Sequence, residues 1–142
     1  MDGAPVALTV PSVLRAAAAD SPDVEAVVDG ELRLTYAALN ARAEQFARAL
    51  IAAGVRPGEA VSIWAPNSAQ WIVAALGTFA AGAVLVPINA RYKGAEAHYL
   101  LAKARVVLLV VDQGFLGHDY LGMLRSAGAC GQGMALILER LG

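Results

Sequence analysis

Apolar residues in the middle of the chain follow two different spacings. From residue 36 to residue 50 they recur every three or four positions, which is the period of a helix with one buried face. Elsewhere they form short unbroken runs rich in β-branched side chains, which is typical of strands buried on both faces. These runs lie at 61–65, 83–87 and 106–111, and helical stretches separate them at 69–82 and 96–104. Helices alternating with such strands predict an α/β fold, in which flanking helices cover a layer of parallel sheet.

The first part of the chain predicts a helix followed by a β-hairpin. Residues 11–20 favour a helix, and the segments 24–28 and 32–34 flank the turn sequence 29–31. Thr35 stands directly before the amphipathic stretch, where a hydroxyl side chain caps a helix.

Turn and cap residues are concentrated between residues 54 and 71. Gly54 can end a helix because glycine adopts positive φ, and Pro57-Gly58 predicts a tight turn. Asn67 or Ser68 is expected to cap the next helix. This segment therefore predicts a helix end, a turn, a short strand and a new helix start.

Residues 71–88 carry no charge over eighteen positions, which meets the lower limit for a membrane span. Gly77, Gly82 and Pro87 interrupt this stretch, so a buried helix and strand is the preferred interpretation. A small membrane protein is the less favoured alternative.

Composition indicates that other protein covers part of this chain. Apolar residues make up 58% of the 142 residues, whereas globular domains have about 45–50% even with glycine included. The net charge is −1 and the basic residues are not clustered, so nucleic acid is not expected as a partner. The basic n-region of a signal peptide is lacking at the N-terminus, and a single cysteine is compatible with the cytoplasmic location that we expect.

The chain contains no motif that assembles a catalytic or metal site. Neither a phosphate-binding loop of the GxxxxGK type nor a GxGxxG sequence after a strand is present. One cysteine, Cys130, and two histidines are too few for an ordinary zinc site. His98 is interpreted as a surface or packing residue of a helix, and His118 as a loop residue. Trp64 and Trp71 are interpreted as core aromatics.

Five short segments resemble the start of an AMP-forming acyl-CoA synthetase of the adenylate-forming superfamily. They are LTY at 34–36, GVRPGEAV at 54–61, APNS at 65–68, AAGAVLVPIN at 80–89 and RYKGAE at 91–96. Each segment is weakly specific by itself, but five in the same order are specific. The resemblance implies that this chain is the first part of the large N-terminal domain of such an enzyme, with a parallel sheet and flanking helices.

The resemblance also implies the reaction. ATP and a fatty-acid-like carboxylic acid form an acyl-adenylate and pyrophosphate with Mg²⁺, and the thiol of CoA then displaces AMP to give the acyl-CoA. In the family the catalytic groups lie downstream of this segment. No catalytic or metal-binding residue is carried over, and the chain is expected to bind none of these cofactors firmly and to be inactive alone.

Asn89 and Arg91 are the candidate binding residues, because the resemblance places their loop beside the channel through which CoA enters. The alternative interpretation, a strand-ending turn with a solvated arginine, is common in loops. We expect the chain to pack against the remainder of its own domain. A stand-alone interaction module of the same fold, which pairs with another chain, is the alternative function.

The chain departs from the family at two places. Ala38 stands where many relatives have glutamate, so the capping box with Thr35 is incomplete. Residues 1–129 are assigned to the AMP-binding domain, and residues 130–142 are interpreted as a divergent tail that arises from a frameshift, a gene-model error or a truncation.

Overall fold

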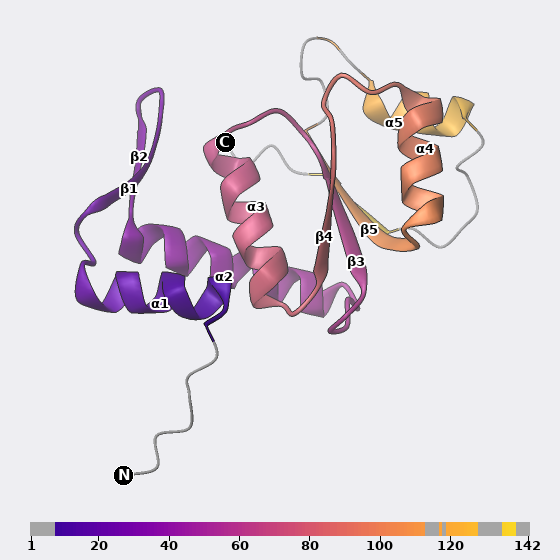
Figure 1. Cartoon of the computed structure of the whole chain (residues 1–142). Coiled ribbons are helices and arrows are strands. Elements are labelled where there is room, and N and C mark those ends of the chain that lie inside the picture. The colour runs from indigo at the N-terminus through magenta and orange to yellow at the C-terminus, as the bar shows by residue number, and fades with distance from the viewer. Residues whose placement is uncertain (1–7, 113–116, 118, 128–134, 139–142) are drawn as a thin grey trace.

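The computed structural model describes residues 8–112, 117, 119–127 and 135–138. It has an α/β architecture (Figure 1). The helices are α1 (Val10–Asp20), α2 (Tyr36–Ala52), α3 (Ala69–Ala80), α4 (Gly94–Lys103) and α5 (Tyr120–Ser126). The strands are β1 (Glu25–Asp29), β2 (Leu32–Thr35), β3 (Ala60–Trp64), β4 (Val84–Ile88), β5 (Val106–Val111) and β6 (Ala135–Leu138).

Four strands form one parallel sheet in the order β4-β3-β5-β6. Helices α2 and α3 cover one face of this sheet, and α4 and α5 cover the other (Figure 1). The predicted layer of parallel sheet with flanking helices is confirmed. The strand β6 had no counterpart in the sequence prediction.

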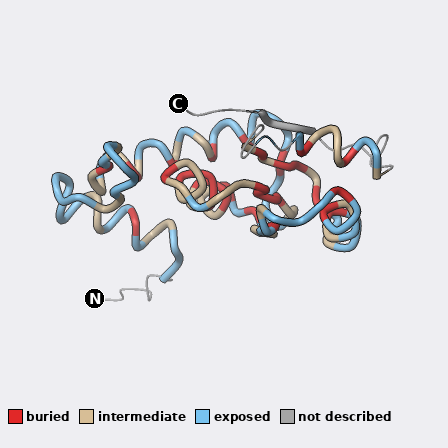
Figure 2. The backbone as a smooth tube through the Cα atoms, turned by 90° about the horizontal axis from the view of Figure 1, so that it is seen from above, coloured by how far each residue is buried: buried red, intermediate tan, exposed pale blue. Residues whose placement is uncertain are grey.

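The central strand β3 alternates its side chains between the two helical layers. Val61 and Ile63 pack on the side of α2 and α3, whereas Trp64 packs on the side of α4 and α5. Residues 61–64 are all buried, and Figure 2 shows most of the buried residues in the inner part of the molecule. Because both faces of the strand are covered, its sequence is an almost unbroken apolar run and does not alternate between apolar and polar residues.

The predicted hairpin is present as an antiparallel pair of β1 and β2 beside α1 and α2. Asp29 at the end of β1 accepts a hydrogen bond of 2.9 Å from the backbone N–H of Ala69. Ser68 accepts a second bond from the N–H of Trp71 at 3.1 Å. Two side chains therefore satisfy donors at the start of α3, and one of them ties the hairpin to that helix.

The predicted caps and turns are found at the expected residues. The Thr35 hydroxyl accepts from the N–H of Ala38, and Ser68 is the cap of α3. Gly54 has φ +96° and follows α2, where the bonds Gly54 N–H to Ile51 O and Val55 N–H to Leu50 O form a Schellman motif. Helix α4 begins two residues before its predicted start, because the Glu96 carboxylate accepts from the N–H of Lys93 at 2.7 Å.

Residues 71–88 form the second part of α3 and all of β4, as predicted. Among the residues that the structure describes, no helix is both long and apolar enough to cross a bilayer.

We predict that Gly77→Ala destabilises the fold. A Cβ at this position of α3 would lie 2.8 Å from the Ala43 carbonyl oxygen and from atoms of Phe46 on α2. Alanine is the better helix former by about 1 kcal/mol, but overpacking costs ~1–3 kcal/mol, so the net change should be a loss. Urea unfolding measures it, and a variant as stable as the parent would contradict close packing of α2 on α3.

We predict that Ser62→Ala leaves the fold equally or more stable. The Ser62 hydroxyl is fully buried in β3 and has no hydrogen-bond partner among the described residues. An unpaired buried hydroxyl costs about 1–3 kcal/mol, so its removal should raise the free energy of unfolding by up to ~1 kcal/mol. Thr78→Val is the control, because the equally buried Thr78 hydroxyl donates to the Ala74 carbonyl at 2.7 Å. Urea unfolding should show the control variant losing stability.

Candidate functional site

The carboxyl ends of the parallel strands lie along one edge of the sheet. Trp64, the last residue of β3, is in register with Ile88 of β4 and with Val111 of β5. From β3 the chain passes along one face of the sheet to β4, whereas from β5 it passes along the other face to β6. The connections therefore diverge between β3 and β5, and in open α/β sheets ligands bind beside such a point.

The loop after β4, residues 89–93, is a compact turn at this edge. The Asn89 side-chain oxygen accepts from the N–H of Arg91 at 2.9 Å, and the Asn89 carbonyl accepts from the N–H of Tyr92 at 2.9 Å. Asn89 therefore has the structural role of the alternative interpretation, a strand-ending turn.

Two exposed cationic residues, Arg91 and Lys93, belong to the same loop. Neither forms an ion pair with another residue that the structure describes. Their positive charges are therefore not neutralised within this part of the chain, and the loop can attract an anionic ligand.

Two buried aromatic side chains hold the loop from beneath. The Trp64 indole donates through Nε1 to the Asn89 carbonyl at 3.1 Å, and the Tyr120 hydroxyl donates to the Ala90 carbonyl at 3.0 Å. The two rings contact each other, with centroids 4.3 Å apart and planes tilted by 44°. Trp64 lies in the core, as predicted, but neither bond has a signal in the sequence, because the partners lie 25 and 30 residues apart.

Burial raises the pKa of the Tyr120 hydroxyl above its ordinary value of 10.0, and the nearby negative charge of Asp112 raises it further. The phenol therefore stays protonated at neutral pH, as a donor to the Ala90 carbonyl requires.

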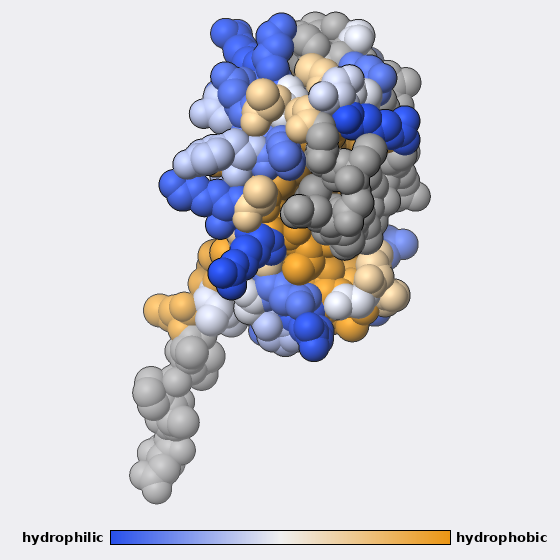
Figure 3. All heavy atoms as spheres, turned by 90° about the vertical axis from the view of Figure 1, so that its right-hand side faces the viewer, coloured by the Kyte–Doolittle hydropathy of each residue, from blue (hydrophilic) through white to orange (hydrophobic). Residues whose placement is uncertain are grey.

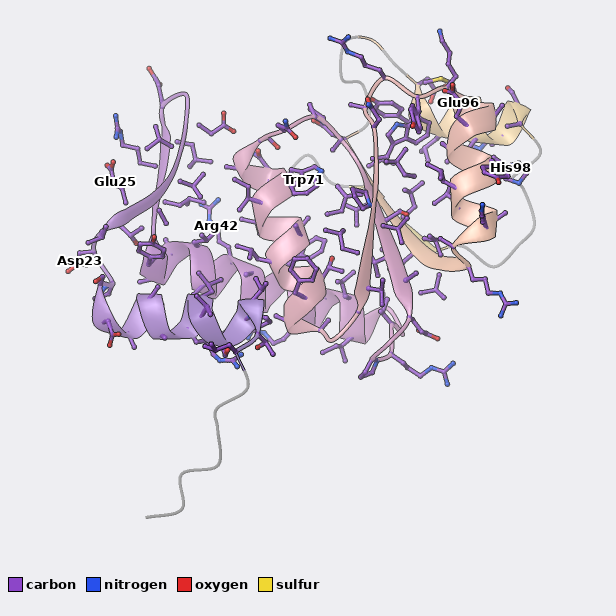
Figure 4. All side chains as sticks on the ribbon, in the orientation of Figure 1. Asp23, Glu25, Arg42, Trp71, Glu96 and His98 are labelled. Carbon is purple, nitrogen blue, oxygen red and sulfur yellow. The ribbon has the colours of Figure 1, made fainter. Side chains whose placement is uncertain are left out.

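The other candidate residues do not join this edge. His98 is half-buried on α4 and points away from the strands, while Glu96 lies at the start of the same helix (Figure 4). His118 and Cys130 lie outside the described residues. Among the described residues there is no group of three His, Cys, Asp or Glu side chains that could hold a metal ion.

A cavity of about 350 Å³ lies between the hairpin and the start of α3. Its walls are formed by Val27, Val28, Trp71 and Ile72 with Asp29, Asn67 and Ser68. Trp71 is half-buried: it borders this cavity and also packs against the core cluster of Ile63, Ala74 and Ala75, in agreement with its interpretation as a core aromatic. The polar side of the cavity is used structurally, because Asp29 and Ser68 cap α3.

The fold and the loop-bearing sheet edge define the start of an adenylate-forming domain. The chain belongs to the AMP-binding enzyme family, because the sequence model of that family matches residues 14–137. The match ends at residue 137, within β6, and the assignment of residues 130–142 to a divergent tail stays a prediction.

Several curated relatives of this chain are acid–CoA ligases. It is 47% identical over 117 residues to 3-[(3aS,4S,7aS)-7a-methyl-1,5-dioxo-octahydro-1H-inden-4-yl]propanoyl:CoA ligase of Rhodococcus jostii, a match to 82% of this chain and 23% of that protein. It is 35% identical over 119 residues to the mitochondrial medium-chain acyl-CoA ligase ACSF2 of Bos taurus, with 82% and 19% covered. The chain therefore spans less than a quarter of the length of these relatives.

A solved structure has the same fold over nearly the whole chain. The anthranilate CoA ligase AuaEII in complex with anthranoyl-AMP aligns with a TM-score of 0.84 and 25% identity, over 96% of this chain and 26% of that one. The predicted family and fold class are thus confirmed.

We predict that alkaline pH reduces the stability advantage of the native chain over Tyr120→Phe. At neutral pH the native chain should be more stable by about 1 kcal/mol, because it keeps the bond to Ala90. As the pH rises through about 10, the unfolded chain loses the Tyr120 proton while the folded chain retains it, so native stability falls. Urea unfolding between pH 7 and 11 measures this, and a constant difference would contradict it.

Proposed function

We propose that this chain forms the first part of the large domain of an AMP-forming carboxylate–CoA ligase. The reaction converts ATP, a carboxylic acid and CoA into acyl-CoA, AMP and pyrophosphate through an acyl-adenylate. The observation that carries the proposal is the 47% identity to an acid–CoA ligase over 82% of the chain. The fold of an anthranilate CoA ligase over 96% of the chain supports it.

The role that we assign to the loop 89–93 is to line the path of CoA. Arg91 and Lys93 are exposed cations at the carboxyl edge of the sheet, and the nucleotide end of CoA carries phosphates that such cations bind. Asn89 contributes by closing the turn that presents Arg91. CoA therefore fits the charge of this loop.

The described residues offer no comparable binding groups for ATP and Mg²⁺. No cluster of acidic side chains is available for the metal among them. The two lysines stand at either end of α4 and not after a loop rich in Ser, Thr and Gly. We propose that the adenylation groups, and most of the pocket for the carboxylic acid, come from the part of the family domain that the relatives carry beyond this match.

Exposed apolar side chains support the idea that more protein covers this chain. Val28, Ile51 and Val84 are each more than half exposed. Figure 3 shows hydrophobic residues at the surface of one side of the molecule. We propose that the remainder of the same domain packs there and that the chain by itself is inactive in the cytoplasm. A separate chain that supplies the missing part is the second candidate, because the same exposed residues would serve it.

A chimera tests the ligase proposal. Residues 14–137 replace the matched segment of the Rhodococcus ligase, and ATP–pyrophosphate exchange is measured with that enzyme's own acid and with a panel of carboxylates. The chimera should be active and the 142-residue chain alone inactive. A folded but inactive chimera would contradict a functional role for this segment, and exchange by the chain alone would contradict its inactivity.

The loop role predicts that Arg91→Gln weakens CoA binding. Loss of one exposed cation that faces a phosphate should raise the Kd about fivefold, which corresponds to ~1 kcal/mol. Calorimetry in low salt measures it on the 142-residue chain, and Arg48→Gln, at an exposed position of α2, is the matched control. Equal Kd values for both variants and the parent would contradict the proposed role of this loop in binding CoA.

A further inference from the structure

We propose that Trp64 and Tyr120 are positioning residues, which together fix the backbone of the loop 89–93 and thereby the place of Arg91. The inference rests on the proposed function only in what the loop binds. The positioning itself rests on contacts between β3, α5 and the loop.

Each aromatic residue binds one of two consecutive peptide groups. The Asn89 carbonyl accepts from the Trp64 indole at 3.1 Å, and the Ala90 carbonyl accepts from the Tyr120 hydroxyl at 3.0 Å. A peptide group is planar, so a fixed carbonyl also fixes the orientation of the N–H that follows it. The peptide units on both sides of Ala90 are thus held just before the chain reaches Arg91.

The two donors are rigid because they are packed against each other. Both side chains are fully buried, and their ring centroids are 4.3 Å apart. Trp64 is the last residue of the central strand, and Tyr120 is the first residue of α5. The loop is therefore anchored to the sheet and to a helix that comes about 30 residues later.

Helix α5 also holds the far end of the loop. Gly94, the first residue of α4, is buried, and a side chain at this position would collide with the backbone of Met123. The loop is consequently held at its beginning through Tyr120 and at its end through the contact between Gly94 and Met123. Arg91 and Lys93, in contrast, remain exposed between these two points.

Tyr120→Phe is the direct test, because it removes the hydroxyl and keeps the ring on Trp64. Tyr99→Phe is a matched control, since the exposed Tyr99 hydroxyl lies on α4 and accepts from Lys103 at 3.2 Å. Amide hydrogen exchange is measured by NMR on the 142-residue chain and both variants. In Tyr120→Phe the amides of Arg91 and Tyr92 should exchange about fivefold faster, the factor typical of one lost hydrogen bond.

The Trp64 indole N–H gives a second readout. It should shift and lose protection in Tyr120→Phe, whereas the indole of Trp71, the other tryptophan, should not change. Unchanged exchange in the loop would overturn the proposal. Equal acceleration in the loop and in the hairpin would also overturn it, because that result indicates general destabilisation.

Titration with CoA separates this inference from the proposed function. If the loop binds CoA, Tyr120→Phe should raise the Kd by a factor similar to the one that exchange reports, and Tyr99→Phe should not. A parent chain that binds no CoA would contradict the role assigned to the loop, while the exchange measurement would still decide the positioning. Tyr120→Phe could also accelerate exchange in the loop and leave the Kd for CoA unchanged. That result would contradict the idea that fixing the loop backbone places Arg91 for binding.

Discussion

Burial of β3 on both faces is the constraint on which the rest of this structure depends. A parallel strand in the middle of a sheet needs a helical layer on each side, because its backbone groups are paired and its side chains point both ways. Helices α2 and α3 supply one layer, and α4 and α5 supply the other. The connections therefore pass along both faces, and because the strands are parallel the carboxyl ends of β3, β4 and β5 lie at one edge, with loops beyond them.

Local signals were sufficient to predict most of the fold. The β-hairpin, the cap at Thr35, the glycine ending of α2 and the unbroken strands all depend on residues close together in sequence. The start of α4 was missed because Gly94 is a poor helix former, and only the capping bond from Lys93 to Glu96 places it in the helix. Strand β6 has a short apolar sequence, and what makes it a strand is its pairing with β5.

The candidate site could be predicted only in part. The family resemblance pointed to Asn89 and Arg91 as binding residues, which stays a prediction; in the structure the Asn89 side chain shapes a turn and Arg91 is exposed. The bonds from Trp64 and Tyr120 could not be read from the sequence, because they join residues 25 and 30 positions apart. Trp71 packs against the core as expected, but its place beside a cavity could not be predicted, because the cavity is formed with the distant hairpin.

The same burial that builds the sheet also explains why the loop can be both exposed and ordered. Two of its backbone carbonyls turn inward to aromatic donors, and the charged group that holds its end, the Glu96 carboxylate, binds the backbone N–H of Lys93 and not a cationic side chain. Arg91 and Lys93 consequently stay available for a ligand. Had the loop been held by ion pairs, those charges would have been neutralised within the fold. Because its two carbonyl bonds come from neutral, buried aromatic side chains, this part of the loop should keep its shape in high salt, whereas any binding of an anion to Arg91 and Lys93 should weaken as salt increases.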